Sequence, residues 1–121
     1  MSISRCNCAG FRLLLGFALC VVTWLALTPH PPALPPVAFA DKLGHLSAFV
    51  VLALLADLSW PEHRFGFAKW GTLLLYGLAI ELLQTQVAHR YFELADLAAD
   101  ALGLALYGLL LVRGMRSLGW R

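Results

Sequence analysis

The chain has 121 residues, of which 60% are hydrophobic and only 13% are charged. An ordinary soluble domain is roughly 45–50% apolar and about a quarter charged, and a chain this short buries a modest fraction of its surface. The composition therefore excludes a soluble monomer, a disordered tail and a coiled coil, and it indicates one integral membrane domain over residues 1–121. A formal net charge of +2 without a basic stripe argues against nucleic acid as a partner.

Four apolar stretches set the predicted elements, because a helix needs about 20 mainly apolar residues to cross a bilayer. These stretches lie at about 13–28, 41–60, 67–88 and 94–112. A proline cluster between Pro29 and Pro36 separates the first two, since proline cannot continue a helix. The other connections are short, so consecutive spans should pack as antiparallel neighbours. The sequence thus predicts an all-α, four-helix membrane bundle with the lipid bilayer as its surroundings.

The first stretch also has features of a signal peptide. Arg5 and Arg12 precede the apolar core, and residues 38–40 read Ala-Phe-Ala, which is typical of a cleavage site. Twelve residues, however, separate Thr28 from Asp41, which is longer than a usual cleavage region. We therefore expect this helix to remain in the mature protein.

The lysines and arginines predict the orientation, because cytoplasmic loops carry an excess of both. With a cytoplasmic N-terminus, seven of these residues lie inside: Arg5, Arg12, Arg64, Lys69, Arg113, Arg116 and Arg121. The other side then holds two, Lys42 and Arg90. We expect both termini to lie in the cytoplasm.

Ionisable side chains inside a span are unfavourable and therefore informative, and here they gather at one end of three spans. Asp41 and His45 are four residues apart, and Glu81 and Gln84 are three apart, so each pair shares a helical face. In the fourth stretch, Asp96 and Asp100 begin a narrow stripe on one helical face that continues through Gly103 and Tyr107. The predicted polar cluster comprises Asp41, Lys42, His45, Glu81, Gln84, Arg90, Asp96 and Asp100. On the predicted topology, this cluster lies in the outer half of the membrane or at its outer surface.

The candidate catalytic residues are His45, Glu81 and Asp100. His45 titrates near neutral pH and could be a base or a proton relay; equally, it could be an interfacial histidine hydrogen-bonded to an aspartate. Glu81 could be an acid or a cation-binding group, or else a structural carboxylate paired with Arg90 or Lys42. A metal site built from the three candidates is conceivable. No H-x-x-x-H spacing supports it, and we predict neither a metal nor a cofactor.

The remaining polar residues have structural interpretations. Asp41 and Asp96 fall near the starts of their helices, where capping and the helix dipole favour a carboxylate. Gln84 is expected to hydrogen-bond across helices. We interpret Asp57 and the loop at 62–64 as a solvated cytoplasmic end.

In order and spacing, the polar residues resemble the signature of the VanZ-like membrane proteins. The pattern is Asp41-Lys42-x-x-His45, then Glu81-x-x-Gln84, then Arg90, then Asp96-x-x-x-Asp100-x-x-Gly103. The resemblance covers about residues 40–110, with the first span as the usual preceding helix. Family members commonly carry Asn where this chain has Asp100, which makes this cluster more acidic.

The resemblance implies a fold and a location more than a reaction. The family takes its name from a protein linked to low-level teicoplanin resistance, and most members have no assigned biochemical activity. It implies a multi-pass protein of the bacterial inner membrane that contributes to cell-envelope function or to glycopeptide resistance.

Three functional classes remain open from the residues. The first, which we favour, is a binding or accessory module for a lipid-linked or peptidoglycan-related envelope ligand. The second is a small membrane enzyme that uses Glu81 and His45 as acid and base on a lipid-linked substrate. The third, a proton or cation pathway on Glu81 and Asp100, is disfavoured because the inner halves of the spans contain almost no polar groups. An open pocket at His45 and Glu81 would favour catalysis. If all polar groups of the cluster were instead paired with one another inside a bundle without water, a structural role would be indicated.

Overall fold

The computed structural model of the protein describes residues 8–29, 40–87 and 92–119, and the regular structure within these ranges is helical throughout. The helices are α1 (Cys8–Leu27), α2 (Ala40–Ser59), α3 (Phe67–Gln84) and α4 (Leu94–Leu106). The last continues through a π-helical turn, η2 (Tyr107–Leu111), into α5 (Val112–Ser117). The predicted all-α architecture with four helices is therefore confirmed.

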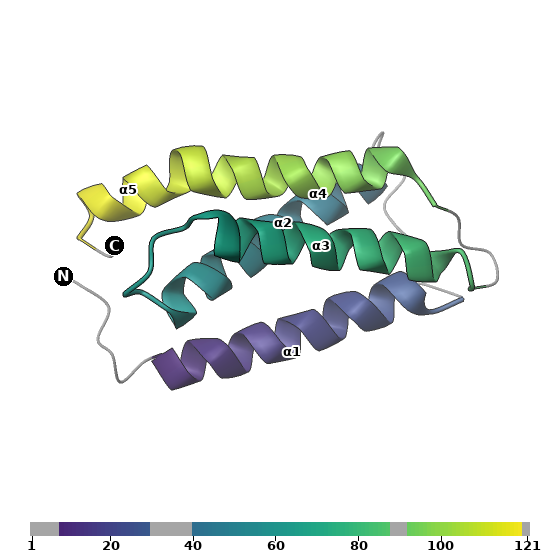
Figure 1. The fold of residues 1–121 in the computed structure, drawn as a ribbon, viewed down its shortest axis with the longest axis horizontal. Coiled ribbons are helices and arrows are strands. Elements are labelled where there is room, and N and C mark those ends of the chain that lie inside the picture. Colours follow the sequence, from purple (N-terminus) through teal and green to yellow (C-terminus); the bar gives the residue numbers. More distant parts are fainter. Residues whose placement is uncertain (1–7, 30–39, 88–91, 120–121) are drawn as a thin grey trace.

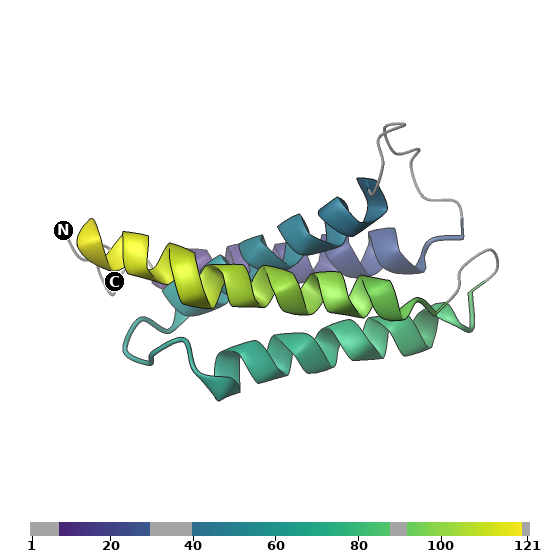
Figure 2. The same ribbon diagram turned by 90° about the horizontal axis from the view of Figure 1, so that it is seen from above.

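The four helical rods lie side by side and alternate in direction (Figure 1). As a result, the start of α1 and the end of α5 lie at the same end of the bundle. The opposite end holds the end of α1, the start of α2, the end of α3 and the start of α4 (Figure 2). This second end, where the polar side chains described below gather, is called the acidic end.

Three of the helical rods are long and apolar enough to cross a membrane: α1, α2 and the continuous rod Leu94–Ser117. The helix α3 has 18 residues and includes Lys69, Glu81 and Gln84, so its composition alone does not mark it as a span. Large apolar side chains such as Phe17 and Leu109 are exposed on the outside of the bundle. Soluble monomers rarely expose apolar surface on this scale, and a bilayer would cover it.

The predicted stretches form helices, but some helices begin or end at other residues than predicted. Helix α1 begins at Cys8 instead of 13 and includes Arg12, whose side chain has partners at the end of α2 and just beyond it. Its Nε donates a hydrogen bond to the main-chain oxygen of Ser59 (3.0 Å), and its guanidinium lies 5.0 Å from the centre of the Trp60 ring. At the other end of the chain, the last rod extends to Ser117 instead of 112.

The core is centred on α2, which packs most extensively against α4 and also against α1. Buried side chains between these helices include Phe49, Leu52, Leu104 and Tyr107. The closest approach is at Gly103, where an added Cβ would lie only 2.5 Å from the main-chain oxygen of Leu46. This approach brings the first two turns of α4 directly against the first turns of α2, and so it positions the candidate site.

Candidate functional site

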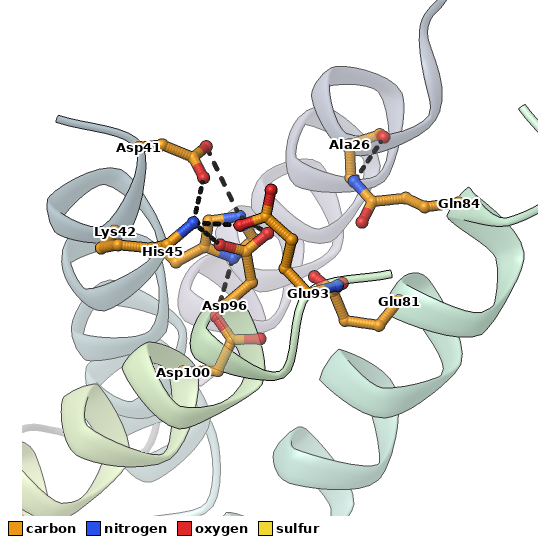
Figure 3. A network of polar contacts seen from close by, with 9 residues as sticks. All are labelled: Ala26, Asp41, Lys42, His45, Glu81, Gln84, Glu93, Asp96 and Asp100. Carbon is orange, nitrogen blue, oxygen red and sulfur yellow. Dashed lines mark hydrogen bonds and ion pairs between the residues drawn. The ribbon is translucent and has the colours of Figure 1, made fainter. Parts of the chain in front are cut away.

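Seven charged or titratable side chains gather at the acidic end, and we call them the acidic cluster (Figure 3). The cluster consists of Asp41, Lys42, His45, Glu81, Glu93, Asp96 and Asp100. Helix α2 contributes the first three, α3 contributes Glu81, and the start of α4 with its preceding residue contributes the rest. Arg90, which the sequence analysis also placed here, lies outside the described residues.

Lys42 holds together the part of the cluster nearest the surface. Its Nζ lies 3.0 Å from Asp41 Oδ2 and 2.6 Å from Asp96 Oδ1. It also donates a hydrogen bond to the carboxylate of Glu93. One ammonium group therefore contacts three carboxylates that come from two different segments of the chain.

His45 lies between three aspartates. Its Nδ1 is 3.0 Å from Asp100 Oδ1, which is hydrogen-bond distance. Its Nε2 is 3.5 Å from Asp96 Oδ2 and 3.9 Å from Asp41 Oδ1, longer than a normal hydrogen bond. The ring is thus oriented through one nitrogen, while the other faces two carboxylate oxygens at a distance.

Glu81 is fully buried, and its partner within the described residues is a main-chain group, while Arg90, one of its two expected partners, lies outside them. Its Oε2 accepts a hydrogen bond from the main-chain N–H of Glu93 (3.1 Å), whereas the contacts of Lys42 go to other carboxylates. Its Oε1 has no hydrogen-bond partner among the residues that the structure describes. Figure 3 shows this carboxylate pointing from α3 toward the side of the cluster formed by Glu93 and Asp96.

Asp96 and Asp100 are both buried on successive turns of α4. Asp96 lies in the first turn, as expected, but it pairs with Lys42, and the N-cap residue Glu93 forms no side-chain cap bond. Asp100 fits against Gly77 of α3, where an added Cβ would lie 2.8 Å from Asp100 Oδ2. The small residue at 77 therefore makes the space that this carboxylate occupies.

Gln84 belongs to a separate contact. Its Nε2 donates a hydrogen bond to the main-chain oxygen of Ala26 (2.8 Å), near the end of α1 (Figure 3). The expected hydrogen bond across helices is present, but it joins α3 to α1 and does not reach the carboxylates. Gln84 is thus a structural contact beside the acidic cluster.

A second buried polar group, which we call the Asp57 network, lies toward the opposite end. Asp57 is fully buried; its Oδ1 lies 2.7 Å from Lys69 Nζ, and its Oδ2 accepts a hydrogen bond from the Tyr107 hydroxyl (2.6 Å). Lys69 also donates to the main-chain oxygens of Trp60 and His63. The interpretation of Asp57 as part of a solvated end is wrong.

The Asp57 network also corrects the premise that the inner halves of the spans contain almost no polar groups. The signal available in the sequence was Tyr107, which continues the stripe of Asp96, Asp100 and Gly103 toward the other end. Its hydroxyl needs a partner when it is buried, and Asp57 supplies one. Hydropathy alone could not reveal that pairing.

Exposure within the acidic cluster decreases from the surface inward. The side chains of Asp41 and Glu93 are 51% and 47% exposed, that of His45 is 19% exposed, and that of Asp100 is 2% exposed. Carboxylates outnumber the ammonium group of Lys42, so the cluster is suited to a cation or to a ligand with several hydrogen-bond donors. The cluster is not a wide open pocket. Its hydrogen-bonding groups are also not all paired, since one oxygen of Glu81 has no partner within the described structure.

In comparisons with known proteins, no family model, no curated protein and no solved structure matches the chain.

Proposed function

We propose that the protein is a VanZ-like integral membrane protein of the bacterial cytoplasmic membrane that binds a cell-envelope component at its acidic cluster. In this role it contributes to envelope function and to low-level glycopeptide (teicoplanin) resistance. The observation that carries the proposal is the graded exposure of the cluster, from half-exposed Asp41 and Glu93 to buried Asp100. Such a site can take up the ammonium or amide groups of a lipid-linked or peptidoglycan-related ligand.

The distribution of basic side chains supports an outward-facing cluster with both termini in the cytoplasm. Arg12, Arg64, Arg113 and Arg116 belong to the segments at the end opposite the acidic cluster (Figure 1). Basic residues concentrate on the cytoplasmic side of membrane proteins. Lys69 contributes less to this argument, because its ammonium is engaged by Asp57.

The second candidate is a membrane enzyme that uses His45 as base and Glu81 as acid on a lipid-linked envelope substrate. The bond between His45 Nδ1 and Asp100 Oδ1 favours it, because a carboxylate that orients an imidazole is a recurring feature of acid–base sites. One oxygen of Glu81 has no hydrogen-bond partner within the described ranges, which also suits a proton donor.

The test is to express the chain in a teicoplanin-sensitive bacterium and compare the wild type with Glu81→Gln and Asp100→Asn. We expect both variants to lose the added resistance at normal protein level, measured as the inhibitory concentration alongside an immunoblot. Glu62→Gln is the matched control, because this exposed carboxylate lies in the loop at the opposite end. Unchanged resistance in both cluster variants at normal abundance would contradict the proposal.

Mass spectrometry of lipid extracts separates the two candidates. A binding protein should co-purify with an envelope lipid whose covalent structure is the same in cells with and without the chain. An enzyme should instead alter that structure, and Glu81→Gln should abolish the alteration.

A further inference from the structure

Asp41 and Asp96 each divide their two oxygens between Lys42 and His45. Asp41 directs Oδ2 to Lys42 Nζ and Oδ1 toward His45 Nε2. Asp96 directs Oδ1 to Lys42 Nζ and Oδ2 toward the same Nε2. Two carboxylate oxygens and one imidazole nitrogen therefore face one another on the side that Lys42 does not occupy.

These atoms lie slightly farther apart than ligands around a bound metal ion. One ligand atom each from Asp41, His45 and Asp96 lie within 4.8 Å of one another. The distances from Nε2 to the two oxygens, 3.5 and 3.9 Å, are too long for hydrogen bonds. Ligands at about 2.1 Å from a tetrahedral ion are roughly 3.4 Å apart, so small side-chain adjustments would bring all three into contact with one ion.

The other nitrogen of His45 has the partner that a metal-binding histidine usually has. A ligating imidazole almost always donates its second N–H to a carboxylate or carbonyl oxygen, which fixes the tautomer. Here Nδ1 lies 3.0 Å from Asp100 Oδ1. With the proton on Nδ1, the lone pair of Nε2 faces Asp41 and Asp96.

Glu81 supplies a second, independent indication of a cationic ligand. This carboxylate is fully buried, has one oxygen without a hydrogen-bond partner among the described residues, and points toward the Glu93 and Asp96 side of the cluster (Figure 3). It lies within electrostatic range of His45, Asp96 and Asp100. A buried carboxylate beside further carboxylates is unfavourable without a counter-charge, and a bound cation would supply a charge that the single hydrogen bond to Oε2 does not.

We propose that Asp41, His45 and Asp96 bind a divalent transition-metal ion such as Zn²⁺, with Asp100 as the positioning residue for His45. One imidazole with carboxylates suits these ions, whereas Ca²⁺ and Mg²⁺ prefer oxygen ligands alone. Three protein ligands leave a position for a further ligand. The half-exposed Asp41 gives the ion a path from the surface.

This set differs from the metal site considered in the sequence analysis, which combined His45 with Glu81 and Asp100. In the site proposed now, two ligands share a helical face of α2, at positions 41 and 45, and the third comes from α4. The proposal rests on this geometry and not on a role in the cell envelope, so the two proposals can fail separately.

The experiment is a Zn²⁺ titration of the full chain, purified in detergent without a polyhistidine tag and stripped with a chelator. Calorimetry should give one ion per chain, and elemental analysis after dialysis should give the same stoichiometry. His45→Gln and Asp96→Asn should weaken binding by roughly 100-fold or more, because each removes a ligand. Asp100→Asn should weaken it by roughly 10–100-fold, the usual effect of losing the partner of a ligating histidine.

Two further variants make the titration decisive. His63→Gln removes an exposed imidazole that lies 4.0 Å from Glu62 at the opposite end, and it should leave binding unchanged. Lys42→Met removes the ammonium that competes for Asp41 and Asp96, and it should strengthen binding several-fold, which a misfolded chain could not do. Absence of stoichiometric Zn²⁺ binding, equal affinity in the wild type and His45→Gln, or no gain in Lys42→Met would overturn the proposal.

Discussion

At the residue scale, Asp57 shows how the bundle accommodates a charge in its interior. Transfer of a carboxylate from water into an apolar core is strongly unfavourable unless the group is paired and hydrogen-bonded. Lys69 engages one oxygen of Asp57 and Tyr107 engages the other. The three residues come from α2, from α3 and from the start of the π-helical turn, so the network ties three helical segments together.

Asp57→Ala should lower the free energy of unfolding by about 3–5 kcal/mol, because it leaves the Lys69 ammonium buried without its counter-charge. The measurement is denaturant-induced unfolding of the purified chain in mixed micelles, followed by circular dichroism. Glu62→Ala, at an exposed position near the same end, should change stability by less than about 0.5 kcal/mol. A similarly small effect of Asp57→Ala would show that the network contributes little.

The residue scale also shows which parts of the site the sequence can reveal. The spacing of Asp41 and His45 on α2, and of Asp96 and Asp100 on α4, correctly indicated side chains that share a face and meet at one end. The partner of each side chain could not be read in the same way. Glu81 contacts a main-chain N–H, and Glu93, which is not part of the predicted polar cluster, contacts Lys42. Such pairings depend on how α2, α3 and the start of α4 lie against one another, which periodicity does not encode.

At the element scale, the contact between α2 and α4 depends on Gly103. An added Cβ there would lie 2.5 Å from Leu46 O and 3.2 Å from Phe49 Cβ, and the first of these neighbours is main chain that cannot rotate away. Gly103→Ala should therefore push the two helices apart. The separation would also move Asp100 away from His45, since both lie close to this contact.

Gly103→Ala should destabilise the bundle by about 1–3 kcal/mol through overpacking, measured by the same unfolding assay. Gly44→Ala is the matched control on α2, where an added Cβ meets nothing within 4 Å. That substitution should stabilise the chain by about 0.5–1 kcal/mol, because alanine is the better helix former. Equal effects of the two substitutions would contradict the close contact.

The positions of the helices were predictable where the length of an apolar stretch or a proline determines them. They were not predictable where tertiary contacts determine them. Four apolar stretches and the prolines after the first were sufficient to locate the helices. Helix α1 includes Arg12, whose contacts with Ser59 and Trp60 have no signal in the apolar pattern. The π-helical turn has no signal in the apolar pattern; it places Gly108 against the ring of Phe65 and Tyr107 beside Asp57.

At the scale of the whole molecule, the alternating rods leave the two polar groups at different ends of one bundle. The acidic cluster opens to the surface through Asp41 and Glu93, whereas the Asp57 network is enclosed. Apolar side chains around Phe49 and Leu52 lie between them. The bundle therefore presents one polar site at one end, and the membrane orientation decides to which side that site is accessible.

Cysteine labelling tests the proposed orientation. In a background with Cys6, Cys8 and Cys20 replaced by alanine, a membrane-impermeant maleimide should label Ala33→Cys in intact cells. It should label Ser2→Cys only after permeabilisation, because the excess of basic residues retains the N-terminal side in the cytoplasm. The reverse pattern would place the acidic cluster on the cytoplasmic side and would remove the basis for an envelope ligand.

Helix α1 has a further consequence for how the molecule is divided. Only Cys8 and Leu15 are buried among its 20 residues. Its polar contacts include those of Arg12 with Ser59, of Thr23 with Tyr76, and of the main chain at Leu19 and Ala26 with side chains of α3. In a bilayer, where apolar contact with a helix replaces apolar contact with lipid at little gain, such polar bonds do most to fix a helix in place. Every residue of the acidic cluster comes from the chain after position 40. The first helix thus packs against α2 and α3 but contributes no side chain to the acidic cluster, so its outer face could diverge while the residues that form the cluster stayed the same.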